Sequence, residues 1–129
     1  MTFLEALGLV VKEMTGKDVP ESDFNLIRLL ADDAKTHLMS ATNRSSVPVG
    51  LQYVWVNQTA GRYINMKLSA KAWSAQDLRV PKTIKEGDTT VDFGDGEADA
   101  KARVGAMLDY LMKDRDIACY RRLKWKSGD

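Results

Sequence analysis

The sequence predicts a mainly α-helical fold, a small bundle of about four helices with one β-hairpin before the last helix. Apolar residues recur at intervals of three and four over several long stretches, which is the period of a helix with one buried face. Alternation by two occurs in one place, around residues 84–93. The chain has 129 residues, 44% of them apolar, so one domain with a real core is expected.

The first helix is predicted to end at Gly16, since glycine is a favourable C-terminal cap. Its apolar face is formed by residues three or four apart: Phe3, Leu7, Val10 (or Val11) and Met14. Pro20 then breaks the helical pattern.

The second helix carries the strongest pattern in the sequence. Its apolar stripe consists of Phe24, Ile27, Leu30, Ala31, Ala34, Leu38 and Ala41. Ser22 or Asp23 is the predicted N-terminal cap, because these side chains accept hydrogen bonds from free amide groups. The alanines allow a neighbouring helix to approach closely, so we expect this helix at the centre of the bundle.

A turn-rich connection over residues 43–50 leads to a third predicted helix, from Leu51 to Leu68 and continuing through residues 69–76. Gly61 weakens this helix by up to ~1 kcal/mol relative to alanine. Next, Ile84, Val91 and Phe93 predict a hairpin that turns at residues 86–88.

The last helix is predicted to begin near Asp95 and Glu97, whose charges suit a helix N-terminus. A break is expected at residues 113–116, where the pattern becomes charged. The apolar face is Val104, Leu108, Met112, Cys119 and Leu123. Residues 120–129 are expected to form an extended tail.

Composition argues against several classes of function. Cys119 and His37 are single, so a Cys/His zinc site would lack ligands, and no cofactor is expected. We interpret His37 as a helix-surface residue and Cys119 as a small buried apolar residue. The sequence offers no nucleophile–base pair or phosphate-binding loop, so we expect no enzymatic activity. It also has no membrane-spanning stretch and no signal peptide, so synthesis in the cytoplasm is expected.

Charge is unevenly distributed, although the formal net charge is only +1. Residues 113–126 contain six basic and two acidic residues, whereas residues 92–99 contain four acidic residues and no basic one. Such asymmetry suits docking against a charged partner, and a solvated helix face would look the same.

Two segments, in this order and spacing, carry a resemblance to a known family. They are the hairpin Ile84-Lys85-Glu86-Gly87-Asp88-Thr89-Thr90-Val91-Asp92-Phe93 and the ending Tyr120-Arg121-Arg122-Leu123-Lys124-Trp125. Together with the order of the helices, they resemble the head-to-tail connector (adaptor) proteins of long-tailed bacteriophages. The resemblance implies a non-catalytic structural protein of the virion neck, made in the cytoplasm of the bacterial host.

Such connectors assemble as a ring of about a dozen copies, which requires two different complementary patches on each subunit. The ring lies beneath the portal protein, extends the DNA channel and docks the next neck, stopper or tail-completion protein. Double-stranded DNA passes through without specific binding. No membrane is involved.

The resemblance also suggests site residues. The expected portal anchor consists of Tyr120, Arg121, Arg122, Leu123, Lys124 and Trp125, with the two aromatic rings as desolvated anchors. The alternative is a helix end that packs back onto its own bundle. Residues expected to contact ring neighbours or the lumen are Arg44, Glu86, Gly87, Asp88, Asp92 and Asp95, and we expect the acidic stretch 92–99 to face the basic C-terminal side of a neighbour.

Two other readings stay open. The basic tail and three tryptophans would suit a small helical nucleic-acid-binding protein, although the near-zero net charge does not favour it. Another helical virion or prophage protein, such as a tail-completion or scaffolding factor, is the third. A mobility-shift assay at low and physiological salt separates nucleic-acid binding from the others.

Overall fold

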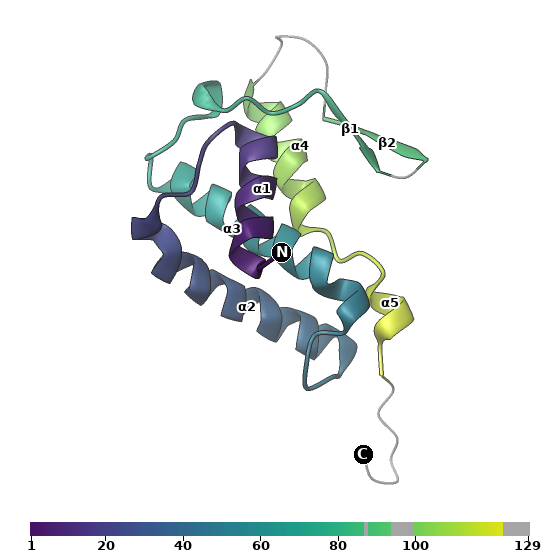
Figure 1. The fold of residues 1–129 in the computed structure, drawn as a ribbon. Coiled ribbons are helices and arrows are strands. Elements are labelled where there is room, and N and C mark those ends of the chain that lie inside the picture. Colours follow the sequence, from purple (N-terminus) through teal and green to yellow (C-terminus); the bar gives the residue numbers. More distant parts are fainter. Residues whose placement is uncertain (87, 94–99, 123–129) are drawn as a thin grey trace, which may run out of the picture.

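The computed structural model describes residues 1–86, 88–93 and 100–122. This part of the chain is mainly helical, with a two-stranded antiparallel hairpin before the last long helix (Figure 1). Its elements are α1 (Phe3–Thr15), α2 (Phe24–Thr42), α3 (Gln52–Ser69), β1 (Thr83–Glu86), β2 (Thr89–Asp92), α4 (Ala100–Met112) and α5 (Ile117–Tyr120). The predicted fold class is confirmed.

Helix α1 has a cap at each end. The Thr2 hydroxyl accepts a hydrogen bond from the Glu5 amide at 3.1 Å, which satisfies one of the free N–H groups of the first turn. At the other end, Gly16 adopts the left-handed conformation, with φ of 75°, and its N–H donates to the Lys12 carbonyl. The predicted glycine cap is confirmed.

Helix α2 has the predicted buried face but not the predicted cap. A 3₁₀ turn, Glu21–Asp23, precedes the helix, and no side chain caps it. The Asp23 carboxylate instead accepts hydrogen bonds from the Tyr63 hydroxyl and from Lys67 Nζ on α3. The Asp23 carboxylate therefore binds donors on α3 and not the free amide groups at the start of α2.

Helix α3, rather than α2, is the central element, which corrects the prediction. It contacts α1, α2 and α4. Its buried face contains small residues, and a Cβ added at Gly61 would lie only 2.8 Å from Met112 Sδ and 3.2 Å from Leu111 Cβ. The close approach of α3 and α4 thus depends on the glycine that weakens α3 locally.

The predicted continuation of the third helix through residues 69–76 is wrong. The helix ends at Ser69, and Lys71 has a positive φ of 61°. The N–H groups of Ala72 and Trp73 fold back onto the Lys67 carbonyl. This reversal brings the Trp73 ring edge-on to the Tyr63 ring, with 5.6 Å between centroids.

The described residues form two apolar clusters inside the bundle. The larger one is shared by α1, α2, α3 and α4 and includes Leu7, Ile27, Tyr63 and Met107. The smaller one contains Leu38, Leu51 and Val54, beneath the connection between α2 and α3.

The hairpin projects from one end of the helices (Figure 1). Thr83 pairs with Asp92 and Glu86 with Thr89, so Glu86 belongs to a strand. At its base, Phe93 is buried and meets the Tyr110 ring at 5.5 Å, which fixes the hairpin to α4. The predicted strand alternation is confirmed, since Val91 is half-buried between exposed neighbours.

The predicted break after the last long helix is also confirmed, because α4 ends at Met112 and α5 begins at Ile117. The predicted start of this helix at Asp95 and Glu97 lies outside the described residues. Cys119 is exposed, so its predicted burial is wrong. The break ends the register of α4, and the short α5 has Ile117 and Tyr120 against the bundle.

Gly8 and Gly105 lie inside helices, and no close packing in the described chain requires a glycine at either position. A Cβ added at either position would meet no atom within 4 Å. A glycine inside a helix costs about 1 kcal/mol relative to alanine. No contact within the described chain accounts for this cost at Gly8 or at Gly105.

Candidate functional site: the C-terminal docking segment

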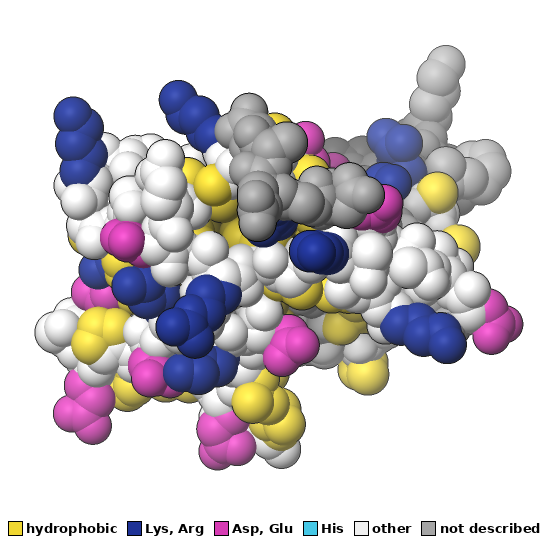
Figure 2. Space-filling view, turned by 90° about the horizontal axis from the view of Figure 1, so that it is seen from above, with side chains coloured by type: hydrophobic (Ala, Val, Ile, Leu, Met, Phe, Trp, Pro, Cys, Tyr) yellow, Lys and Arg dark blue, Asp and Glu magenta, His cyan; other side chains and the backbone are white. Residues whose placement is uncertain are grey.

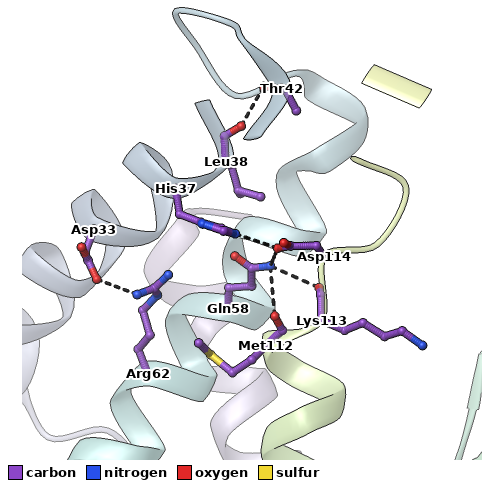
Figure 3. A network of polar contacts seen from close by, with 9 residues as sticks. All are labelled: Asp33, His37, Leu38, Thr42, Gln58, Arg62, Met112, Lys113 and Asp114. Atoms are coloured by element: carbon purple, nitrogen blue, oxygen red, sulfur yellow. Dashed lines mark hydrogen bonds and ion pairs between the residues drawn. The ribbon is translucent and has the colours of Figure 1, made fainter. Parts of the chain in front are cut away.

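The C-terminal docking segment is defined here as residues 112–122, which run from the end of α4 along the corner between α2 and α3. At its start, the Gln58 side chain is 1% exposed and lies against the end of α4 (Figure 3). Its Nε2 donates to the carbonyls of Met112 and Lys113, at 3.3 and 3.2 Å, and to Asp114 Oδ1 at 2.7 Å. Free carbonyls at this helix end are thus satisfied by an interior side chain.

Asp114 also connects the segment to α2. His37 Nε2 lies 2.8 Å from the same Asp114 oxygen that Gln58 contacts. His37 is therefore a helix-surface residue with a structural contact, in line with the sequence interpretation. On the next turn, Arg62 Nη1 and Asp33 form a 2.6 Å ion pair that also joins α3 to α2 (Figure 3).

The chain then turns at Asp116, which has a positive φ of 58°. The Tyr53 hydroxyl donates a hydrogen bond to the Asp116 carboxylate, so α3 fixes the position of this turn. Helix α5 follows and directs Ile117 and Tyr120 towards the smaller apolar cluster.

Tyr120 packs closely over Gly50. A Cβ added at Gly50 would lie 1.8 Å from the Tyr120 hydroxyl oxygen, so any larger residue there would displace the ring. Tyr120 is half-buried in this position. A glycine in the 3₁₀ turn just before α3 is thus what lets the ring reach the corner.

Three hydrogen bonds hold the last described residues to the corner. Arg44 Nε donates to the Tyr120 carbonyl at 2.6 Å. The Arg122 N–H donates to the Thr42 carbonyl at 2.7 Å, and Asn43 Nδ2 donates to the Arg122 carbonyl at 2.9 Å. Both polar backbone groups of Arg122 are therefore bound by the end of α2.

The residues predicted to anchor the protein to the portal differ in their surroundings. Tyr120 contacts its own bundle, which matches the alternative interpretation for this residue, while the side chains of Arg121 and Arg122 are exposed. Leu123, Lys124 and Trp125 lie outside the described residues. Sequence reasoning missed the corner that receives Tyr120, and the one signal for it was Gly50 in a polar connection.

The residues expected to contact ring neighbours or the lumen are not brought together. Arg44 lies at the corner between α2 and α3, whereas exposed Asp88 and Asp92 lie on the hairpin, at a different end of the bundle (Figure 1). Asp92 lines a hollow together with Lys113 and Arg115. The acidic and basic residues were expected to meet across two neighbouring subunits. Asp92, Lys113 and Arg115 instead lie near one another within a single chain.

The other expected ring or lumen residues cannot be placed. Gly87 and Asp95, and the side chain of Glu86, lie outside the described part of the chain.

A second polar cluster joins the start of α2 to α3. Asp23 accepts hydrogen bonds from the Tyr63 hydroxyl and, at 3.0 Å, from Lys67 Nζ. The Tyr63 hydrogen bond and the Lys67 ammonium lower the pKa of Asp23, against the opposing effect of burial. Burial and the neighbouring carboxylate raise the pKa of Tyr63. Both shifts favour a charged Asp23 beside a neutral Tyr63.

Among residues 1–86, 88–93 and 100–122, no three metal-ligating side chains gather. Within the same ranges, no helix combines the length and apolar character needed to cross a membrane. On the face shown in Figure 2, several lysine and arginine side chains gather left of centre, and acidic side chains lie around them.

Comparison with known proteins gives no assignment: no family model, curated protein or solved structure matches this chain. The fold therefore defines a class by architecture alone, a small helical bundle with a hairpin between its third and fourth long helices.

Proposed function

We propose that this protein is a structural head-to-tail connector of a long-tailed bacteriophage or prophage. In this role it assembles as a ring beneath the portal protein, extends the DNA channel and docks the next neck or tail-completion protein. Residues 123–126, Leu-Lys-Trp-Lys, are the proposed contact with the portal. The protein performs no catalysis.

One observation carries this proposal furthest. The backbone of Arg122 is bound on both sides by Thr42 and Asn43, so the residues that follow start from a fixed point on the bundle. Directly after this point, the sequence places an aromatic residue among cations. Aromatic and basic side chains of this kind are the ones that dominate binding energy at protein interfaces.

Further support comes from the order of elements. The helices, the hairpin with its Lys-Glu-Gly-Asp-Thr segment and the basic aromatic ending follow one another as in the connector family that the sequence resembles.

Truncation after Arg122 tests the proposal more cleanly than removal of residues 120–129, because Tyr120 and Arg122 contact the bundle. We expect the truncated protein to keep its Tm and to lose binding to the portal protein of the same phage or prophage. Trp125→Ala should weaken binding by about 2 kcal/mol, roughly 30-fold in Kd.

The control is Lys82→Ala, which removes an exposed cation elsewhere on the surface and should leave portal binding unchanged. Portal binding by the truncated protein at full affinity would refute the proposed anchor. Tight DNA binding that weakens steeply with salt would favour the nucleic-acid-binding alternative.

A further inference from the structure

Three exposed arginines lie at the corner between α2 and α3: Arg44, Arg121 and Arg122. None of them forms an ion pair with another residue in the described part of the chain. Arg44 Nε donates to the Tyr120 carbonyl at 2.6 Å, so its guanidinium lies against the peptide bond that joins Tyr120 to Arg121. We call these three arginines the arginine patch.

The two chain segments that form the corner carry little negative charge. Residues 42–53 and 116–122 contain the three arginines and a single acid, Asp116, whose carboxylate accepts a hydrogen bond from the Tyr53 hydroxyl. The preceding acid in the sequence, Asp114, is bound by side chains of α2 and α3. Like charges gathered in this way repel one another, and an anionic partner would remove the repulsion.

The arginine patch is held in place by contacts that leave its charges available. Arg122 is bound to the end of α2 through its backbone N–H and carbonyl. Arg44 uses its Nε, and its two terminal nitrogens form no hydrogen bond with a described residue. Such nitrogens can donate to a carboxylate. A basic group that is already fixed in position loses less conformational entropy when a partner binds.

Exposed apolar groups at the same corner indicate the class of partner. Val49 is 88% exposed and directly precedes Gly50, over which the Tyr120 ring packs. A protein segment can place an apolar side chain on Val49 and carboxylates on the arginines at the same time. A protein that holds DNA by about six to ten phosphate contacts needs a longer basic surface than three arginines provide. The observations therefore favour an acidic protein segment over a nucleic acid.

We propose that the arginine patch and Val49 bind an acidic segment of a partner protein, with carboxylates on the arginines and an apolar side chain against Val49. The patch adjoins the point from which residues 123–129 start, so the portal protein is the expected source of the segment. That assignment rests on the proposed function. Recognition of an acidic protein segment at this corner does not.

Titration with a synthetic peptide tests the site in the full chain. The probe is Glu-Leu-Asp-Glu-Leu-Asp with both ends blocked, added at low salt to ¹⁵N-labelled protein. We expect NMR shifts confined to the amide signals of Arg44, Val49, Arg121, Arg122 and their neighbours, and to the Arg44 Nε–H signal. Absence of shifts at these residues at millimolar peptide would overturn the proposal.

A double variant separates the charges from the fold. Arg121→Ala/Arg122→Ala removes two exposed side chains and keeps the backbone contacts of Arg122, so Tm should stay unchanged. The peptide Kd should rise about fivefold. The matched control, Arg28→Ala/Lys82→Ala, removes two exposed cations outside the corner and should leave Kd unchanged. Equal weakening by the two double variants would contradict a defined site.

Two comparisons test the class of partner. Val49→Ser should weaken binding of the leucine-containing peptide and should not affect a peptide in which serine replaces both leucines. Equal effects on the two peptides would refute the apolar contact at Val49. Duplex DNA that shifts the same NMR signals more strongly than the peptide at physiological salt would overturn the proposal in favour of a nucleic-acid partner.

Binding to the portal protein of the same phage or prophage separates this inference from the proposed function. Loss of both peptide and portal binding in Arg121→Ala/Arg122→Ala supports the assignment of the acidic segment to the portal. Loss of peptide binding with unchanged portal binding would refute that assignment and leave the acidic-segment site standing. A wild-type protein that binds the portal and not the peptide would overturn the acidic-segment site alone.

Discussion

Asp23 is an example of a residue whose role depends on a distant partner. The sequence places it before a strong helical stripe, where a carboxylate usually caps the helix. In the fold it is bound by Tyr63 and Lys67 on α3, residues 40 and 44 positions away. Local sequence contains no information about that pairing, so the cap was the natural prediction and the cross-helix contact could not be predicted.

The lowered pKa of Asp23 predicts acid sensitivity. A carboxyl whose pKa is lower in the folded than in the unfolded state adds stability above the unfolded value of about 4, and this stability is lost as pH falls through the folded pKa. Asp23→Asn should therefore reduce the free energy of unfolding by about 1–3 kcal/mol at pH 7. The loss should shrink below pH ~4.

Urea unfolding of Asp23→Asn and wild type between pH 3 and pH 7 measures this difference. The control is Asp18→Asn, whose side chain is 84% exposed and should show no such effect. A gap between Asp23→Asn and wild type that stays constant over the whole pH range would contradict the assigned role of the Asp23 carboxylate.

At the scale of elements, three helix glycines are predicted to respond differently to alanine. Gly8→Ala should stabilise the monomer by about 0.5–1 kcal/mol, because its Cβ meets nothing and alanine favours the helix. Gly61→Ala should destabilise it by about 1–3 kcal/mol, since Met112 and Leu111 stand in the way. Gly105→Ala should behave like Gly8→Ala.

Thermal unfolding of the three variants measures these effects. Gly8→Ala and Gly105→Ala should raise Tm, whereas Gly61→Ala should lower Tm. If all three variants shift Tm in the same direction, the packing at Gly61 or the open space at the other two positions is described incorrectly.

Predictability from sequence also differs by element. The residue 24–41 stripe and Gly16 were sufficient to predict two helices and a cap, because period and backbone freedom are local properties. The end of α3 could not be predicted, since it depends on Lys71 adopting a positive φ and on Trp73 packing against Tyr63. The exposure of Cys119 likewise follows from the break after Met112, which shifts the helical register.

The candidate site shows the same division. The basic aromatic ending was predicted as a docking site from residue types alone, and residues 123–125 of it lie outside the described part of the chain. The corner that holds Tyr120 required the fold. Gly50, Arg44 and Thr42 come from one connection and one helix end, yet their contacts lie seventy or more residues further along the chain. Pairings at that separation leave no periodic signal in a single sequence.

For the whole molecule, the corner between α2 and α3 and the hairpin lie at different ends of the bundle (Figure 1). The corner binds residues 120–122 through Arg44, Thr42 and Asn43. The hairpin is fixed to α4 by Phe93. The proposed connector role needs separate surfaces of this kind, because a subunit in a closed ring must bind two neighbours and a different protein at once.

The most direct test of the account is quantitative mass spectrometry of purified particles from the phage or prophage that encodes this chain. The account predicts that the protein is present in mature particles in about a dozen copies, in fixed ratio to the portal protein. Truncation after Arg122 should remove it from the particles. Mature particles that lack the protein, or that keep the truncated form at full copy number, would contradict the central claim.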